Sequence, residues 1–287
     1  MTVLDNFSTA DKANLADVTV HPKLEIVLGD ITNGALMRDL FENTGAAVVV
    51  HLAARNASTS VADPSEVIRT NVRGTETILN EVVLASSLPT VVFASSATIY
   101  GNPIYTPIDE KHPLNPQTVY AKTKVECEGL MTEVAQNGIR AVSLRLFNVY
   151  GPGQIGKHGA VVPRFTEAIS SDRAITLDGG GDQKRSFIYV SDVADAFLLA
   201  AVKTEVHGHE IYNIGSPHVY TVKELAEEIA TLLARDLKVT NAPRRDRDVP
   251  VSYPDISKAM QELGFNPAVS LEEGLRKTIA WIQNQSD

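Results

Sequence analysis

The chain has 287 residues, of which 44% are hydrophobic and 21% are charged. This ordinary globular composition argues against long disordered segments, collagen-like repeats and disulfide scaffolds. The formal net charge of -9 and the lack of any long run of Lys or Arg argue against a nucleic acid partner. Cys127 is the single cysteine and the seven histidines show no zinc-type spacing, so we expect no metal site and a reducing compartment.

No apolar stretch approaches the ~20 residues that a membrane span needs, and the N-terminus lacks the pattern of a secretion signal. We therefore expect a cytoplasmic protein without membrane association. Apolar runs of strand length alternate with stretches whose apolar residues recur every three or four positions. The expected strands are Thr2–Leu4, Leu24–Leu28, Ala47–Ala53, Thr90–Ser95 and Ile139–Val149, and the expected helices between them are Asn33–Asn43, Pro64–Ser86 and Gln117–Asn137.

This order of strand, helix and strand predicts an α/β fold with a doubly wound parallel sheet. After about residue 150 Gly and Pro become frequent and the alternation loosens. We expect a domain of residues 1–150 and a smaller mixed α/β domain of residues 151–287, with some exchange of chain between the two. The elements expected in the second domain are helices at Val161–Ser170, Val193–Val202, Val222–Ala234 and Leu271–Gln283, and strands at Ala174–Leu177 and Phe187–Val190.

Open parallel sheets bind ligands at the carboxyl ends of their strands. The candidate positions at these ends are Asp5 with Asn6, Asp30 with Ile31, the turn of Leu52, Ala53 and Ala54, and Ser95 with Ser96. His51 lies inside an apolar run, so we interpret it as a core histidine without a chemical role.

Tyr120 and Lys124 stand four residues apart in an expected helix, which places both on one face. A nearby ammonium favours the phenolate and moves the tyrosine pKa, ~10 in the free residue, towards neutral pH. The pair suits a general base, and the Ser96 hydroxyl suits a bond to a substrate oxygen. The same spacing also arises by chance, with the tyrosine packed and the lysine solvated. The preceding strand, which ends in SSATIYG, favours the catalytic interpretation.

With these motifs the chain resembles an extended short-chain dehydrogenase/reductase of the NAD-dependent sugar-nucleotide epimerase/dehydratase family, over nearly its whole length. The resemblance implies a Rossmann-like domain that binds NAD and a catalytic trio of Ser96, Tyr120 and Lys124. Asp5 would bind the adenosine ribose, although Asp before Asn also commonly caps a turn. The full implied cofactor site is Asp5, Asn6, Asp30, Ile31, Leu52, Ala53, Ala54, Asn71, Tyr120 and Lys124. Asn71 would steady the catalytic region, and the alternative is an asparagine that only hydrogen-bonds locally inside its helix.

The resemblance also implies a nucleotide-sugar site. Asn148, in LRLFNVYGPG, would hold the sugar nucleotide, and Arg185, in DQKRSFIYVSD, would bind its diphosphate. A solvated pair of Lys184 and Arg185 is the alternative, but a guanidinium fork suits phosphate oxygens. The later contacts to diphosphate and to ribose or uracil would come from Arg245 and Asp248, and the small Ser252 would lie beside the C2 substituent of the sugar.

Members of the family begin with a strand, a glycine-rich turn and a helix that receive the cofactor pyrophosphate. Met1 to Asp5 matches the end of the second strand instead, so we expect this unit to be missing, either through an internal start codon or through real loss. We expect an open sheet edge, weak NAD binding, poor stability and little activity of the 287 residues alone. Gly151, Gly153 and Gly156 spell a second G-x-G-x-x-G after a late strand, which we interpret as a substrate-side loop.

The residues after Ser96 narrow the implied reaction. Dehydratases of the family carry Asp and Glu there, and decarboxylases keep the Glu, whereas this chain has Ala97 and Thr98. The remaining chemistry is 4-epimerisation of a UDP-hexose through a transient 4-keto sugar, with UDP-glucose and UDP-galactose as substrates and the N-acetylated forms as further candidates.

Two alternatives stay open. One is another epimerase or reductase of the family that acts on GDP- or dTDP-sugars, and the other is a cofactor-free, non-catalytic fragment that binds sugar nucleotides. The resemblance further implies a homodimer packed through the helices Pro64–Ser86 and Gln117–Asn137.

Overall fold

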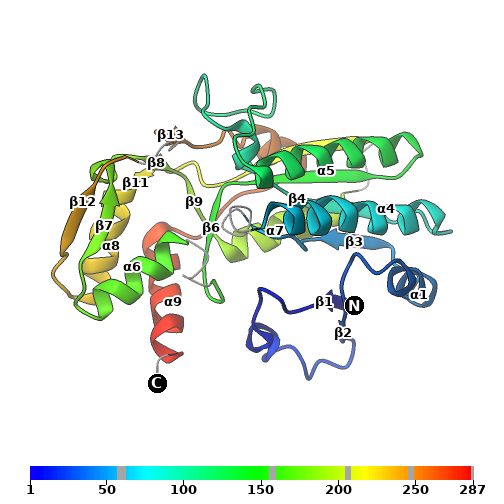
Figure 1. The fold of residues 1–287 in the computed structure, drawn as a ribbon, viewed down its shortest axis with the longest axis horizontal. Coiled ribbons are helices and arrows are strands. Elements are labelled where there is room, and N and C mark those ends of the chain that lie inside the picture. The colour runs from blue at the N-terminus through cyan, green and yellow to red at the C-terminus, as the bar shows by residue number, and fades with distance from the viewer. Residues whose placement is uncertain (57–62, 155–159, 204–207, 245–248, 286–287) are drawn as a thin grey trace. The chain divides into compact units, whose positions relative to one another are not determined.

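The computed structural model describes residues 1–56, 63–154, 160–203, 208–244 and 249–285 (Figure 1). The chain divides into two compact units, each assembled from three separate stretches. The first unit is Met1–Ser95, Thr118–Leu144 and Ala201–Ile211, and the second is Ser96–Gln117, Arg145–Ala200 and Tyr212–Asp287. The boundary predicted between residues 150 and 151 stays a prediction.

The first two strands pair only with each other in the described part of the chain. β1 (Thr2–Asp5) runs parallel to β2 (Glu25–Leu28), with Asp5 opposite Leu28. The crossover between them contains a short 3-10 turn, η1 (Lys12–Leu15). Parallel pairing brings the carboxyl ends of both strands to the same edge, where polar residues follow each strand.

The remaining strands of the expected sheet form a second sheet of order β10-β5-β4-β3. β3 (Val48–His51) runs parallel to β4 (Thr90–Ser96), and its neighbours further along are β5 (Ala141–Leu146) and β10 (His209–Ile214). The side chains of Val48 and Val50 are exposed on β3. β3 is also the last strand of this sheet among the described residues, so the open sheet edge that the sequence predicts is present there.

Two helices of the first unit begin and end at recognisable capping residues. α1 (Gly34–Thr44) begins where the Asn33 side chain accepts from the Leu36 N–H, and it ends at Gly45 with a left-handed φ of 53°. α5 (Val119–Gln136) begins at Thr118, whose hydroxyl accepts from the Ala121 N–H at 3.1 Å. Both helices lie within two residues of their predicted ends.

The single helix expected at Pro64–Ser86 contains a wide turn. It consists of α3 (Pro64–Ile68), a π-helical turn η2 (Arg69–Arg73) and α4 (Gly74–Leu84). Gly74 follows the wide turn because a Cβ there would collide with the side chain of Ile31. Apolar periodicity does not register an extra residue in one turn, and such π turns occur often at functional sites.

The core of the first unit lies between its helices and β4. Figure 1 shows α4 and α5 side by side, and their apolar residues pack with Val91 and Phe93 of β4. Cys127 is a buried free thiol of α5 in this core. The buried members of the cluster are Ile31, Met37, Ile78, Leu79, Val82, Val91, Phe93, Cys127, Met131, Val134, Ile139 and Ala141.

The later part of the chain contains short strands that sequence periodicity does not detect. The expected strand Ile139–Val149 is interrupted at Phe147, so that β6 (Asn148–Tyr150) leaves β5 and pairs in parallel with β9 (Phe187–Tyr189). The other pairs are β7 (Ile175–Asp178) with β12 (Val239–Ala242), and β8 (Lys184–Arg185) with both β11 (Tyr220–Thr221) and β13 (Val251–Ser252).

Three helices of the second unit share an apolar core with β7 and β9. They are α6 (Val161–Ser170), α8 (Val222–Leu233) and α9 (Leu271–Asn284). The capping box of α8 explains its sharp start: the Thr221 hydroxyl accepts from the Glu224 N–H at 3.0 Å, and Glu224 accepts from the Thr221 N–H. The remaining helices and turns are η3 (Ala97–Tyr100), η5 (Gly179–Gly181), α7 (Val190–Val202) and η6 (Ala259–Leu263).

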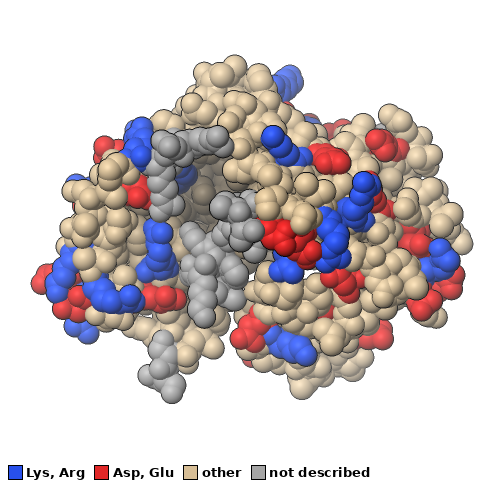
Figure 2. All heavy atoms as spheres, viewed as in Figure 1, with Lys and Arg blue, Asp and Glu red and all other residues tan. Residues whose placement is uncertain are grey.

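The surface carries charges of both signs. Figure 2 shows basic and acidic side chains intermingled on one face of the molecule, rather than gathered into a large field of one sign. Among the described residues no helix combines the length and the apolar character that crossing a bilayer requires.

Candidate active site

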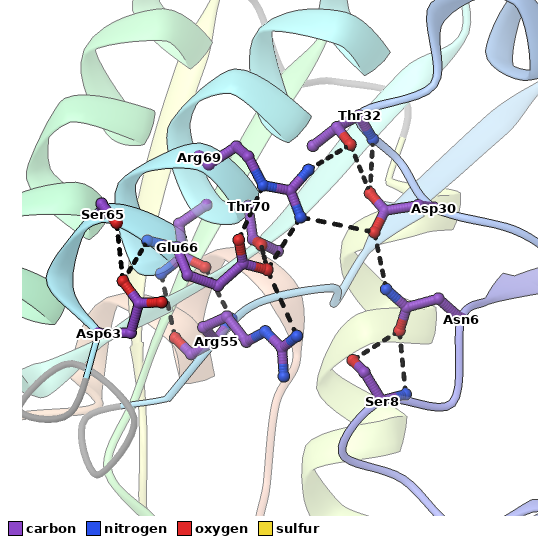
Figure 3. Close-up of polar contacts among 11 residues, drawn as sticks. Asn6, Ser8, Asp30, Thr32, Arg55, Asp63, Ser65, Glu66, Arg69 and Thr70 are labelled. Carbon is purple, nitrogen blue, oxygen red and sulfur yellow. Dashed lines mark hydrogen bonds and ion pairs between the residues drawn. The ribbon is translucent and has the colours of Figure 1, made fainter.

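Polar side chains after β1 and β2 hydrogen-bond to each other, as their positions at one sheet edge predict (Figure 3). Asn6 donates from Nδ2 to Oδ2 of Asp30 at 2.8 Å, and its Oδ1 accepts from the Ser8 N–H and hydroxyl. Asp5 accepts from the Phe7 N–H at 2.7 Å through Oδ1. Oδ2 of Asp5 has no hydrogen-bond donor within the described ranges, so this oxygen can accept from a ligand.

Asp30 is a half-buried carboxylate held by several donors. Burial opposes its ionisation, but the Thr32 N–H and hydroxyl and the Asn6 amide donate to it, and Arg69 lies nearby. Together these contacts outweigh burial and hold the pKa of Asp30 below its usual value. Asp30 is therefore an ionised acceptor at neutral pH.

A chain of ion pairs extends from Asp30, and sequence analysis did not single it out. The Arg69 guanidinium forks onto Glu66 with distances of 2.8 and 2.9 Å, donates to Oγ1 of Thr32 at 2.8 Å and lies 4.0 Å from Asp30. Arg55 also donates to Glu66 at 3.3 Å. The three-residue spacing of Glu66 and Arg69 in an expected helix could have indicated their ion pair. It gave no indication of the contacts that Arg69 makes with Thr32 and Asp30, or of the bond from Arg55 to Glu66.

Asn71 connects three segments through its side-chain amide. It is only 2% exposed, accepts from the Arg55 N–H at 2.7 Å, and donates to the Arg55 carbonyl and to Oγ1 of Thr123. Both amide hydrogens thus go to protein acceptors. Asn71 holds the chain after β3 against the helix that carries the predicted catalytic pair.

The apolar residues of the predicted cofactor site differ in burial. Ile31 is buried in the core of the first unit, and Ala53 packs against the same core. Leu52 is 58% exposed and Ala54 is half-buried. The turn from Leu52 to Ala54 therefore keeps apolar surface available to a ligand at the end of β3.

Lys124 and Tyr120 lie on one face of α5, as predicted. Lys124 is 3% exposed; its Nζ donates to the Ala94 carbonyl at 2.7 Å and lies 4.6 Å from the ring centroid of Phe93 and 5.7 Å from that of Tyr120. No carboxylate pairs with this ammonium in the part of the chain that is described, and two of its N–H bonds have no acceptor there. A buried cation of this kind favours oxygen ligands nearby.

His51 is a buried core residue, which confirms its prediction. Its Nε2 lies 2.8 Å from Oγ1 of Thr75, whose hydroxyl donates to the Asn71 carbonyl. Burial, aided by the positive charge of Lys124, lowers the pKa of His51 to about 3. The ring is therefore neutral at physiological pH and adds no positive charge beside Lys124.

Ser96 ends β4 and caps the 3-10 turn η3. Its hydroxyl oxygen accepts from the Thr98 N–H at 3.3 Å and from the Thr98 hydroxyl at 3.0 Å. Two accepted bonds polarise the hydroxyl and leave its own hydrogen for a further acceptor. Ala97 offers no acid or base beside it.

A cavity of about 300 Å³ in the second unit contains two of the predicted substrate residues, Asn148 and Arg185. Asn148 is held by a bond from its Nδ2 to the Ser186 carbonyl at 2.9 Å, and Arg185 donates to the Lys184 carbonyl at 2.9 Å. Arg164 adds a second guanidinium to the lining. The lining thus offers two guanidinium groups and the Asn148 amide beside one carboxylate, that of Asp178.

Other predicted substrate residues lie near this cavity or outside the described residues. Ser252 of β13 is the parallel partner of Arg185 in β8, which brings these two together. Arg245 and Asp248 fall outside the described residues, as does Gly156. Gly151 and Gly153 follow β6 and precede Gln154, which lines the cavity.

The turn before β8 explains the position of Arg185. Gly179, Gly180 and Gly181 have φ values of 56°, 76° and 79°, which side chains rarely tolerate. Gln183 follows and donates from Nε2 to the Asp178 carbonyl at 2.7 Å, which closes the turn. The three glycines therefore form a turn that directs the chain back to the cavity.

The known proteins with similar sequences include nucleotide-sugar epimerases and decarboxylases. A putative UDP-glucose 4-epimerase of Methanocaldococcus jannaschii is 35% identical over 99% of this chain and 90% of its own length. UDP-glucuronic acid decarboxylase 6 of Arabidopsis thaliana is 33% identical over 95% of this chain and 78% of its own length. Sequence similarity therefore extends to more than one reaction.

Solved structures resemble this fold over nearly its full length. The UDP-glucose 4-epimerase of Thermotoga maritima, solved with UDP-glucose, has a TM-score of 0.91 and 29% identity and covers 100% of this chain and 91% of its own. The Thermus thermophilus UDP-glucose 4-epimerase, solved with NAD, has a TM-score of 0.87 and 30% identity and covers 98% and 90%. The prediction of a Rossmann-like α/β fold is confirmed.

NAD is the cofactor of this class of enzyme, and the donor set of the first unit fits it. The free oxygen of Asp5 and the ionised Asp30 can accept from ribose hydroxyls and a base amino group, while Lys124 has N–H bonds to donate. Residues 1–215 match the family described as "NAD dependent epimerase/dehydratase family". The chain belongs to this family of nucleotide-sugar enzymes.

Proposed function

We propose that the enzyme interconverts the C4 epimers of a UDP-hexose, with UDP-glucose and UDP-galactose as its substrates. The observation that carries the proposal is the pair of residues after Ser96. Ala97 has no ionisable group and the Thr98 hydroxyl is donated to Ser96. Because elimination of water and loss of carbon dioxide need an acid or base that these residues do not supply, the chemistry left is oxidation at C4 followed by reduction.

Tyr120 is the acid and base of the proposed reaction. Its hydroxyl has no hydrogen-bond partner within the described ranges, so it is free to bond the sugar 4-hydroxyl. It takes the proton as the 4-keto sugar forms and returns it to the same oxygen when the sugar is reduced on its other face. Lys124 stabilises the phenolate electrostatically. When bound, NAD supplies the hydride acceptor and donor.

Ser96 complements Tyr120 as a hydrogen-bond donor to the 4-oxygen. Its oxygen already accepts from two Thr98 groups, so its own hydrogen is the one available to substrate. A donor in this state strengthens its bond as negative charge develops on the sugar oxygen.

Arg185 and Asn148 are the proposed substrate contacts in the second unit. A guanidinium can donate two parallel bonds to diphosphate oxygens, which a lysine cannot match. The cavity of about 300 Å³ lies at the lower end of the usual range for small-molecule sites. The Thermotoga enzyme solved with UDP-glucose supports a UDP-hexose as the ligand.

Ser252 allows a wider substrate range. It is a small, half-buried side chain opposite Arg185, so an N-acetyl group at C2 has room beside it. We therefore propose UDP-N-acetylglucosamine as a second substrate. Ser252→Tyr should reduce turnover of the acetylated sugar and spare UDP-glucose; equal or greater turnover of the acetylated sugar would contradict this.

The function is tested by incubating the purified chain with NAD and UDP-galactose and measuring UDP-glucose by chromatography. Parallel reactions with GDP-mannose and dTDP-glucose test the alternative that another nucleotide sugar is the substrate. Formation of a 4-keto-6-deoxy sugar from dTDP-glucose, or of UDP-xylose from UDP-glucuronate, would contradict epimerisation. Binding of UDP-galactose without turnover would favour the non-catalytic alternative.

We also propose that two copies associate through the helices α3, η2, α4 and α5. The apolar side chains of Ile68 in α3 and of Val83 and Leu84 in α4 are exposed. Light scattering across micromolar concentrations should give twice the 31.0 kDa chain mass. A monomer over the whole range would exclude the dimer.

A further inference from the structure

The Arg69 side chain is 48% exposed, yet all three of its guanidinium nitrogens donate hydrogen bonds. Its guanidinium makes two hydrogen bonds to the two carboxylate oxygens of Glu66 and a third to the Thr32 hydroxyl (Figure 3). These three bonds use the three different guanidinium nitrogens, so they fix both the position and the orientation of the guanidinium plane. Hydrogen bonding to Glu66 raises the pKa of Arg69, and the bond from Arg69 lowers the pKa of Glu66.

The contacts of Arg69 cross between parts of the chain that are distant in sequence. Thr32 lies 37 positions before Arg69 and follows β2, whereas Glu66 lies in α3. The Thr32 hydroxyl in turn donates to Oδ1 of Asp30 at 2.7 Å. Arg69 therefore reaches Asp30 by two routes, through Thr32 and directly at 4.0 Å.

The second partner of Glu66 extends the network to the end of β3. Arg55 donates to Oε1 of Glu66 at 3.3 Å, and the Arg55 backbone is held by Asn71. Arg55 directly follows the turn of Leu52 to Ala54. One carboxylate thus ties the residues after β2, which include Asp30, to those after β3, which follow the turn of Leu52 to Ala54 in the predicted cofactor site.

We propose that Arg69, held by Glu66, is a positioning residue for the adenosine half of NAD. It holds the Asp30 carboxylate in place, through Thr32 and directly, so that the carboxylate can accept from a ribose hydroxyl or from the adenine amino group without first being ordered. A preorganised acceptor binds more tightly because less conformational entropy is lost when the ligand arrives. The proposal rests on NAD as the cofactor and is independent of which sugar nucleotide is the substrate.

Arg69→Met tests the proposal by keeping an unbranched apolar stem and removing the guanidinium with its charge and its three hydrogen bonds. Calorimetry with ADP-ribose, which lacks nicotinamide, should show about tenfold weaker binding, since hydrogen bonds to charged groups contribute on this scale. NAD should weaken by a similar factor. Hydrogen exchange at the Thr32 amide should become faster in the ligand-free variant, because its acceptor Asp30 is less well held.

The matched control is Arg276→Met. Arg276 likewise pairs with a glutamate one turn away, Glu272, but on α9 of the second unit, so its loss should leave ADP-ribose binding unchanged. Thr32→Val is the second variant, because it removes only the bridging hydroxyl and keeps the shape of the side chain. It should weaken ADP-ribose binding in the same direction. Binding of UDP reports separately on the second unit and should be the same in all variants.

Unchanged ADP-ribose affinity in both Arg69→Met and Thr32→Val would overturn the proposal, as would failure of the wild-type chain to bind ADP-ribose. Equal weakening of ADP-ribose and UDP would indicate a general loss of structure and would also contradict it. If ADP-ribose behaves as expected but UDP does not bind the wild type, the positioning role stands and the proposed substrate is wrong.

Discussion

The polar groups of the two units are organised in different ways. In the first unit Asn6, Asp30 and Arg69 bond to one another, and their charges are already paired before any ligand is present. In the second unit Asn148 and Arg185 each make a bond to a backbone carbonyl and line a cavity. The first arrangement is preorganised by mutual contacts, and the second exposes its donors to an anionic ligand.

This difference agrees with the two kinds of ligand. A cofactor that is regenerated in every cycle gains from a site whose geometry is set in advance, because the ordering cost is not incurred on binding. A substrate must enter and leave, so its site needs donors that a ligand satisfies in place of water. The comparison predicts that substitutions in the two units affect separate measurable quantities.

The largest effect is expected for Tyr120→Phe, which removes the proposed acid and base. The kcat of epimerisation should fall by ~10²–10⁴, the usual contribution of general acid–base catalysis. Binding of NAD and of UDP should change little, because removal of the Tyr120 hydroxyl breaks no hydrogen bond within the described residues and so leaves the surrounding structure as it is. Single-turnover kinetics with titration of both ligands measures these quantities. A kcat within about tenfold of the wild type would exclude Tyr120 as the base.

Arg185→Met should raise the KM for UDP-galactose by ~10–100-fold, because it removes charge-assisted hydrogen bonds to the diphosphate. NAD affinity should stay the same, which would sharpen the separation of the two sites. Lys184→Met is the matched control on the same strand, and its exposed side chain should be replaceable without effect. Equal effects of the two variants would indicate that Arg185 is only part of a solvated basic pair.

His51 gives the first unit a specific dependence on pH. Its pKa is about 3 in the folded chain and ~6.5 when unfolded, so between these values the unfolded state binds a proton that the folded state does not. Stability is therefore complete above about pH 6.5 and falls by ~1.4 kcal/mol for each pH unit below it. In denaturant titrations at pH 5, 6 and 7, the free energy of unfolding of His51→Gln should depend less steeply on pH than that of the wild type. If the free energy of unfolding depends on pH identically in the variant and the wild type, the pKa of His51 is the same in the folded and unfolded states.

The smallest effect is expected in the second unit, for Thr221→Ala. Loss of the cap of α8 should reduce the free energy of unfolding by ~1 kcal/mol, since the Glu224 N–H loses its acceptor. The dependence of stability on pH between 5 and 7 should match the wild type, in contrast to His51→Gln. Denaturant titration at the same three pH values tests both statements. If the free energy of unfolding of Thr221→Ala depends on pH differently from that of the wild type, the pH effect does not arise from His51 alone.

Local pattern was sufficient for the long elements. The helix expected at Val161–Ser170 forms over those residues, because its apolar spacing and a helix have the same period. Local pattern failed for β11 and β13, which have two residues each and are strands only because β8 lies between them. It also missed the π turn η2, after which Gly74 lies close against the side chain of Ile31.

Within the candidate site, sequence placed the residues that act through near neighbours. Tyr120 and Lys124 are four positions apart, and helix geometry alone puts them on one face. Asn71 and Thr123 are 52 positions apart, so their hydrogen bond exists only because η2 packs against α5. Arg69 escaped notice for the same reason, since its partner Thr32 belongs to another segment.

The sequence by itself determined the alternation of strands and helices, the catalytic motif and the family, because these depend on periodicity and on short spacings. Only the tertiary structure decided which polar groups meet. It joined Arg69 to Thr32, opposed Ser252 to Arg185 and left the buried Lys124 without a carboxylate among the described residues. The physical reason is that a hydrogen bond needs a partner within about 3 Å. Chain folding, rather than distance along the sequence, brings most such partners together.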